Sequence, residues 1–307
     1  MARLVLMGTP EYARRIFAGV WDPSDEILVV TKPDAPQGRR RVSTPSAVAD
    51  WAQSLGLSVL KPTKMVEIRP ALEAFSPDWI LTAAFGRILP AWLLALPRCG
   101  AYNLHASLLP RWRGPNPIAW AIKSGDAITG VTLMQMDAGV DTGPIVEQKA
   151  TAIDPEDTTG TLTGKLADLA VLVWREVRAR HGVVRFDGRP QDDAKATYAP
   201  KFSRDAGRIA WGDAARAIDA HVRSMTPEPG AYTMLRDQRV KILQASPEPA
   251  PTAGQPPGFA TLAGEDWRVT TGEGMLRVRR IQPEGRRPMT PGEFARGQRG
   301  DGGWQLT

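Results

Sequence analysis

The residue types best suited to proton transfer and oxyanion binding stand two positions apart in Asn103-Leu104-His105. An asparagine amide can donate a hydrogen bond to a developing oxyanion. Histidine, whose reference pKa is about 6.5, exchanges protons near neutral pH. Residues two apart in a strand lie on the same face, so Asn103 and His105 are expected to project together from a strand over Gly100–Leu104. A lone histidine at a strand end is more often structural, and the paired asparagine weakens that alternative.

A carboxylate partner for the histidine is expected in the turn Asp137-Ala138-Gly139-Val140-Asp141-Thr142. A carboxylate held beside His105 would orient its ring and raise its basicity. Asp137 continues the preceding strand pattern, which makes Asp141 the better candidate. Turn aspartates usually bind their own backbone, so a structural role for each of them stays open at this point.

The elements that must position these side chains alternate along the first half of the chain. Continuous apolar strands separated by helical segments predict a parallel sheet covered on both faces. This is a doubly wound, Rossmann-like α/β domain, and its ligands bind at the carboxyl ends of the strands. The expected strands are Leu4–Met7, Glu26–Val30, Leu57–Leu60, Asp78–Thr82 and Gly100–Leu104, and the expected helices are Glu11–Val20 and Ser46–Leu55.

The pattern changes in the second half. Paired strands are expected over Thr129–Met136 and Gly143–Ile153, followed by a long helix over Thr161–His181. We predict a catalytic domain at 1–185, a polar linker at 186–200 and a C-terminal domain at 201–307. Short strand candidates separated by Gly- and Pro-containing turns predict a small, OB-like β-barrel for this last part.

Composition limits the class of protein. The chain has 307 residues with a net charge of +6. One cysteine excludes a disulfide scaffold and a cysteine-rich zinc site. The chain contains no run of about 18 apolar residues, so no membrane-spanning helix is predicted. We expect a cytoplasmic protein. Residues 200–307 carry 16 basic and 12 acidic side chains, against 23 and 21 in the first 199. A basic barrel and the run Arg39-Arg40-Arg41 suit an acidic or nucleic-acid partner, although a solvated Arg-rich surface also fits the charge alone.

The segments Asn103–Gly114 and Gln135–Gly143 together resemble the folate-dependent formyltransferases. The resemblance extends to Gly8-Thr9-Pro10, to Ala84–Pro90 and to Tyr198-Ala199-Pro200-Lys201, and it covers almost the entire chain. It departs from the common pattern at Pro115-Asn116-Pro117. Asn116 is one of only two asparagines in the chain, and its role is left unassigned.

The resemblance implies an enzyme that transfers the formyl group of 10-formyltetrahydrofolate to the α-amine of initiator methionyl-tRNA. Asn103 and His105 would then stabilise the tetrahedral oxyanion, and Asp141 would support His105 and help to relay protons. It also implies a monomer without a metal or a membrane association. The folate site implied by the resemblance is lined by Phe85, Gly86, Arg87, Ile88, Leu89, Ser107, Leu108, Leu109, Pro110, Gly139 and Val140, and the implied tRNA contacts are Lys32, Arg39, Arg40 and Arg41.

Three alternatives stay open. In the first alternative, the acceptor of the formyl group is a small amine, such as glycinamide ribonucleotide or an amino-sugar nucleotide, or it is water. A second alternative is a non-catalytic RNA-binding protein on the same scaffold. A third is a nicotinamide-dependent oxidoreductase, which the absence of a GxGxxG sequence after the first strand disfavours.

Overall fold

The computed structural model describes residues 1–37, 42–203, 205–248, 254–297 and 303–307. The chain divides into two compact units. The first comprises Met1–Pro117, Ile128–Ala152 and Thr163–Pro200, and the second comprises Ile118–Ala127, Ile153–Leu162 and Lys201–Thr307. The domain limits predicted near residues 185 and 200 stay a prediction.

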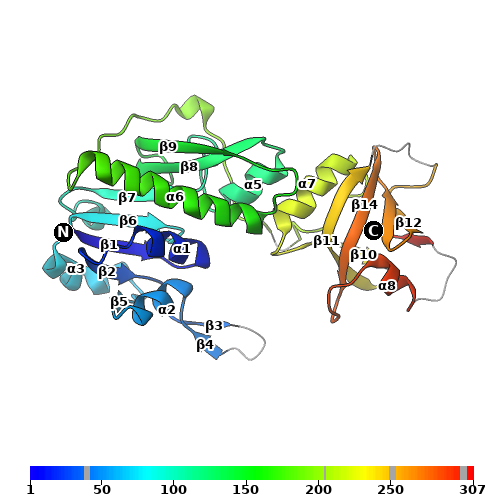
Figure 1. Cartoon of the computed structure of the whole chain (residues 1–307), viewed down its shortest axis with the longest axis horizontal. Helices are drawn as coiled ribbons and strands as arrows, with labels where there is room; N and C mark the ends of the chain where they lie inside the picture. Colours follow the sequence, from blue (N-terminus) through cyan, green and yellow to red (C-terminus); the bar gives the residue numbers. More distant parts are fainter. Residues whose placement is uncertain (38–41, 204, 249–253, 298–302) are drawn as a thin grey trace. The chain divides into compact units, whose positions relative to one another are not determined.

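A seven-stranded sheet in the order β5-β2-β1-β6-β7-β8-β9 forms the centre of the first unit (Figure 1). The strands from β5 to β7 run parallel, and β8 and β9 continue the sheet antiparallel. Every residue of β6 is buried, as expected for a strand covered on both faces. The strands are β1 (Arg3–Gly8), β2 (Glu26–Val30), β5 (Ser58–Leu60), β6 (Trp79–Ala83), β7 (Ala101–His105), β8 (Ile128–Gln135) and β9 (Ile145–Ala152).

Helices pack against this sheet. Val5 of β1 belongs to one buried cluster with Leu72 of α3 and Leu93 of α4. α1 packs against α2 through the rings of Phe17 and Trp51, whose centroids are 6.4 Å apart. Figure 1 shows α6 crossing the sheet. The predicted Rossmann-like α/β fold is therefore confirmed. The helices of this unit are α1 (Glu11–Val20), α2 (Ala47–Ser54), α3 (Arg69–Phe75), α4 (Ala91–Leu94) and most of α6 (Thr159–His181), whereas α5 (Pro117–Lys123) belongs largely to the second unit.

The polar segment 186–200, which the sequence suggests as a linker, packs onto the first unit. Phe186 is buried between aromatic rings, with ring centroids 5.4 Å from Trp79 and 5.0 Å from Tyr102. Further along, the main chain of Tyr198 forms a parallel bridge to Arg113. This segment therefore lies against the loop that follows β7.

The second unit confirms the predicted small β-barrel. Its strands follow the order β10-β11-β14-β13-β12-β15, and an antiparallel bridge between Leu235 and Leu306 joins the two ends. Trp267 and Phe294 lie in its core. The elements are α7 (Ala215–Met225), β10 (Ala231–Leu235), β11 (Gln238–Glu248), β12 (Phe259–Ala263), β13 (Asp266–Thr270), β14 (Met275–Pro283), α8 (Pro291–Ala295) and β15 (Gly303–Gln305). No helix in the described parts of the chain is long and apolar enough to cross a membrane.

Candidate active site

Asn103 lies near the carboxyl end of β7, beside Thr82 of the neighbouring parallel strand β6. Thr82 Oγ1 donates a hydrogen bond of 2.8 Å to Asn103 Oδ1. Because the amide oxygen is occupied in this way, the amide nitrogen points to the other side, where Asn103 Nδ2 lies 3.4 Å from Asp141 Oδ1. Thr82 thus fixes the asparagine as a hydrogen-bond donor toward Asp141.

His105 is the last residue of β7, and it is only 6% exposed. Its Nε2 lies 2.9 Å from the main-chain oxygen of Trp112. A carbonyl oxygen only accepts, so Nε2 must carry a proton and donate it. The proton that the ring gains or loses is therefore the one on Nδ1, and Nδ1 lies 3.5 Å from Asp141 Oδ1.

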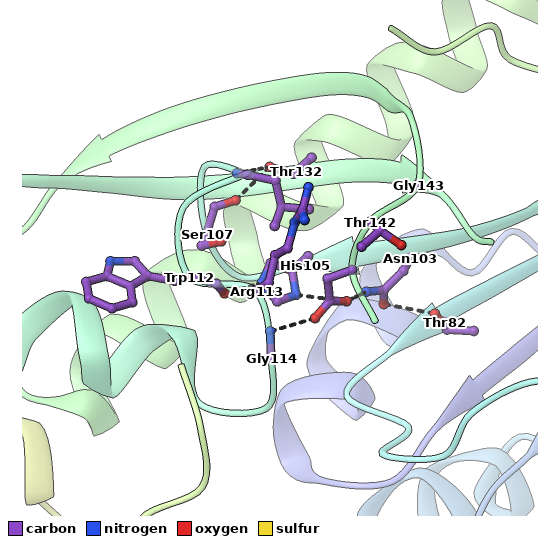
Figure 2. Close-up of polar contacts among 12 residues, drawn as sticks. Thr82, Asn103, His105, Ser107, Trp112, Arg113, Gly114, Thr132, Thr142 and Gly143 are labelled. Carbon is purple, nitrogen blue, oxygen red and sulfur yellow. Dashed lines mark hydrogen bonds and ion pairs between the residues drawn. The ribbon is translucent and has the colours of Figure 1, made fainter. Parts of the chain in front are cut away.

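Asp141 stands between the two in the turn after β8. Its Oδ2 accepts a hydrogen bond of 2.8 Å from the main-chain N–H of Gly114, and Oδ1 lies near both Asn103 and His105. Figure 2 shows Asn103 and His105 close together, with Thr82 beside Asn103 and the loop of Gly114 nearby. Asp137 behaves differently, because it accepts hydrogen bonds from Gly139 and Thr142 within its own turn. The structure therefore brings Asn103, His105 and Asp141 together and leaves Asp137 apart.

The loop from Trp112 to Gly114 supplies the other two contacts. Trp112 has the left-handed φ of 64°, which directs its carbonyl to His105. Gly114 has a φ of 116°, and a Cβ on it would lie 2.9 Å from the Ala199 carbonyl oxygen. Only glycine meets both demands without strain. The segment after residue 190 holds this loop, since the main-chain N–H of Trp112 donates to Thr197 Oγ1.

The side chains of several residues proposed to line the folate site are buried in the protein core. Phe85 and Leu89 belong to the cluster under α3 and α4, and Leu109 packs with Met134 and Ile145. Ser107 is fully buried, and its Oγ donates to the Arg111 carbonyl at 2.6 Å. Each of these residues is 4% exposed or less, so their side chains are packed inside the protein.

Other proposed folate residues face outward. The side chains of Ile88 and Val140 are 73% and 55% exposed, so both apolar groups are open to solvent. Arg87 donates to the Pro62 carbonyl at 2.9 Å, so its guanidinium is partly committed to the protein. Gly86 and Gly139 are exposed, and Leu108 and Pro110 are half-buried.

The proposed tRNA contacts are only partly described. Arg39, Arg40 and Arg41 lie outside the described residues. The flanking segments form a short antiparallel pair, β3 (Ala35–Gln37) and β4 (Val42–Thr44). Lys32 lies close to Gly86, because a Cβ built on that glycine would be 3.1 Å from Lys32 Nζ. Lys32 is thus adjacent to the proposed folate loop.

Asn116, the other asparagine, has a structural contact. Its main-chain N–H donates to the Ala199 carbonyl at 3.2 Å, and its Nδ2 lies 3.4 Å from the Pro200 carbonyl. Among the described residues, no three His, Cys, Asp or Glu side chains are grouped so as to hold a metal ion. A metal-free reaction stays a prediction.

Sequence reasoning missed the residues that orient this set. Thr82 ends an expected strand next to that of Asn103, and this position was a usable signal. Trp112 contacts His105 through its main-chain carbonyl. Every residue type has this group, so the identity of residue 112 gave no signal. Arg113 and Gln191 connect the two loops through side chains far apart in the chain, and nothing in the local sequence marks them as partners.

Comparison with known proteins defines the class. Residues 2–177 match the formyl transferase family, and residues 201–299 match the formyl transferase C-terminal domain. The chain belongs to the formyl transferase family and is an enzyme of that class. Its similar relatives bear a more specific name, methionyl-tRNA formyltransferase. The relative from Gluconobacter oxydans is 40% identical over 96% of this chain and 97% of its own length, and that from Thermus thermophilus is 37% identical over 96% of each chain.

Solved structures share the fold at low identity. HypX from Aquifex aeolicus, in complex with tetrahydrofolic acid, has a TM-score of 0.65 and 19% identity, covering 98% of this chain and 50% of HypX. WlaRD, a sugar 3N-formyl transferase, has a TM-score of 0.68 and 15% identity, covering 94% of this chain and 99% of that protein. At these identities the likeness concerns the fold alone.

Proposed function

We propose that this enzyme transfers the formyl group of 10-formyltetrahydrofolate to the α-amine of initiator methionyl-tRNA. The observation that carries the proposal is the similarity to methionyl-tRNA formyltransferases along 96% of the chain at about 40% identity. The convergence of an amide, an imidazole and a carboxylate at the end of β7 supports it, because acyl transfer to an amine needs both oxyanion stabilisation and proton transfer.

The amide of Asn103 is the first group assigned to the reaction. Attack of the neutral α-amine on the formyl carbon forms a C–N bond and moves one electron pair onto the formyl oxygen. Asn103 Nδ2 donates a hydrogen bond to that oxygen. Thr82 keeps the amide in this orientation at 2.8 Å, so the donor is in place before charge develops.

His105 and Asp141 account for the protons. The amine loses one proton after the attack, and N10 of the folate gains one as the C–N10 bond breaks. His105 exchanges protons at Nδ1, since Nε2 is held by the Trp112 carbonyl. Asp141, 3.5 Å from Nδ1, stabilises the imidazolium by its negative charge and connects His105 with Asn103.

The two substrates are assigned to different surfaces. The exposed apolar side chains of Ile88 and Val140, together with the main chain of the neighbouring lining residues, are proposed to contact the folate. Lys32, Arg39, Arg40 and Arg41 are proposed to contact tRNA phosphates. We assign further contacts with the acceptor arm to the basic barrel. The enzyme is proposed to act as a monomer in the cytoplasm.

The test is formyl transfer from labelled 10-formyltetrahydrofolate to three acceptors: charged initiator tRNA, an amino-sugar nucleotide, and water alone. We expect N-formylmethionine only on the charged tRNA. Formylation of the sugar nucleotide instead of the tRNA would show that the enzyme acts on a small amine. Binding of tRNA without any turnover would instead support a non-catalytic RNA-binding protein.

The proposed tRNA contacts of Arg39, Arg40 and Arg41 are tested separately, through the salt dependence of tRNA binding. Each phosphate contact contributes a slope of about 0.9 to the logarithmic dependence of binding on salt concentration. Arg39→Ala and Arg41→Ala should each weaken tRNA binding and reduce that slope by about 1, with the Kd for folate unchanged. Equal losses for both substrates would exclude a tRNA-specific role.

A further inference from the structure

Gln191, on the segment 186–200, links the two loops that hold the catalytic side chains. Its Nε2 donates to the main-chain oxygen of Asp141 at 2.9 Å and to that of Gly143 at 2.7 Å. Its Oε1 accepts from Arg113 Nε at 3.1 Å and from Arg113 Nη2 at 2.8 Å. Both ends of the amide are therefore engaged, and its orientation is fixed, because the oxygen faces only donors and the nitrogen only acceptors.

Arg113 lies between Trp112 and Gly114 in the chain. The main-chain groups of these two residues bind the side chains of His105 and Asp141. The carbonyl of Trp112 accepts from His105 Nε2 at 2.9 Å, and the N–H of Gly114 donates to Asp141 Oδ2 at 2.8 Å. Arg113 itself is 3% exposed. A buried guanidinium is costly unless its N–H groups are satisfied, and Gln191 satisfies two of them. A shift of Arg113 would therefore move both main-chain contacts.

Asp141 needs such a restraint for a second reason. Its φ of 55° is left-handed, a region that residues other than glycine adopt uncommonly and that surrounding contacts must hold in place. The hydrogen bond from Gln191 to the Asp141 carbonyl acts on the main chain and opposes its relaxation.

From this arrangement we propose that Gln191 is a positioning residue for formyl transfer, acting with Arg113 to set the separation between His105 and Asp141. Gln191 contacts neither the imidazole nor the carboxylate, and it acts only through the loops that carry them. The inference rests on the proposed function insofar as its rate is measured by formyl transfer.

The direct test replaces Gln191 by Met, which has a similar length but no hydrogen bonds, and by Glu, which still accepts from Arg113 but cannot donate to the two carbonyls. Displacement of catalytic groups by about 1 Å costs on the order of 100-fold in rate. We therefore expect kcat to fall about 10- to 100-fold in both variants, with KM changed less than about threefold. If one variant fails to fold, the other decides the question.

Two controls separate positioning from general destabilisation. Ser54→Ala removes a side-chain hydrogen bond to a main-chain oxygen, from Oγ to the Trp51 carbonyl at 2.7 Å, in α2 of the same unit, and its kcat should stay unchanged. The second control is the double variant with Asp141→Asn. If Gln191 acts through Asp141, Gln191→Met should cost little further rate in that background, because groups that act as a unit are not additive. Additive losses, or an unchanged kcat in both Gln191 variants, would overturn the proposal.

A readout without substrate keeps this inference distinct from the proposed function. The ring-nitrogen NMR signals of His105, assigned with His105→Gln, should shift in the Gln191 variants. Those of His181 and His221 should not. This result supports the positioning role even if the enzyme formylates another acceptor or shows no transfer, whereas unchanged His105 signals contradict it.

Discussion

Asp141→Asn separates the charge of this side chain from its shape. In the native site Oδ1 lies 3.5 Å from His105 Nδ1, and both side chains are largely buried, His105 at 6% and Asp141 at 16% exposure. With an effective dielectric constant of about 20, two unit charges at this distance attract by about 5 kcal/mol. This is an upper limit on what the carboxylate contributes when the imidazole is protonated, and it corresponds to roughly three to four orders of magnitude in rate.

The substitution also turns the contact with Asn103 from a donor–acceptor pair into a pair of two donors. If the oxygen of the new amide keeps the hydrogen bond from Gly114, its NH₂ group must face Asn103 Nδ2, which is itself a donor. We expect kcat for formyl transfer to fall about 100- to 1000-fold, with the Kd for folate and the melting temperature close to those of the native protein. Single-turnover formylation of charged tRNA, followed as a function of pH, measures the loss at the chemical step.

Asp137→Asn is the matched control in the same turn. Its carboxylate binds only Gly139 and Thr142 among the described contacts, so the same change of charge should alter kcat by less than about threefold, as expected away from the reacting atoms. A rate for Asp141→Asn within about threefold of native, in a folded protein, would refute the role of Asp141 in charge stabilisation.

Three further perturbations address the support of the site and of the fold. Thr82→Val removes the donor to Asn103 Oδ1 at 2.8 Å, so kcat in single turnover should fall about 10-fold as the amide loses its orientation; an unchanged rate contradicts that function. Gly114→Ala forces a Cβ to 2.9 Å from a carbonyl oxygen at a φ of 116°, and urea denaturation should show a loss of about 2 kcal/mol in unfolding free energy. Burial alone would raise the pKa of Asp78, but hydrogen bonds from the Arg3 N–H and the Arg98 guanidinium outweigh it and lower the pKa below 3.8. Its carboxylate therefore stabilises the fold above about pH 3.8 and loses that effect as the pH falls through the lowered pKa. Asp78→Asn should cost about 1–3 kcal/mol of unfolding free energy at about pH 7 and progressively less as the pH falls below 3.8 through the lowered pKa; an equal cost at neutral and acid pH argues against the linkage.

The sequence predicted those parts of the molecule that periodicity or residue type encodes. The apolar runs of the β1 and β6 strands, and the spacing of Asn103 and His105, carry their own signal. Asp141 followed from turn composition and was supported by the family resemblance. By contrast, a motif does not tell which side chains point inward. Phe85 and Leu89 of the proposed folate loop are buried in the core, whereas Ile88 between them is 73% exposed.

Contacts made by the main chain were beyond prediction for a physical reason. The carbonyl that fixes the His105 ring belongs to Trp112, and any residue at that position has a carbonyl. Its direction depends on a left-handed φ of 64°, which a tryptophan adopts only when the surrounding structure imposes it. Local propensity therefore argues against the conformation that the site uses, and tertiary contacts decide it.

Those tertiary contacts come largely from the segment that the sequence suggests is a connector. Thr197 accepts at Oγ1 from the Trp112 N–H, and Gln191 donates to the Asp141 carbonyl. The left-handed conformations of Trp112 and of Asp141 itself are thus restrained by residues 191–197. Because a left-handed residue relaxes when its restraints are removed, a fragment that ends at residue 185 would keep Asn103, His105 and Asp141 but lose the hydrogen bonds that hold them in register. We therefore expect the proposed catalytic unit to need the segment 186–200 in addition to residues 1–185, which formyl transfer by the two fragments would test.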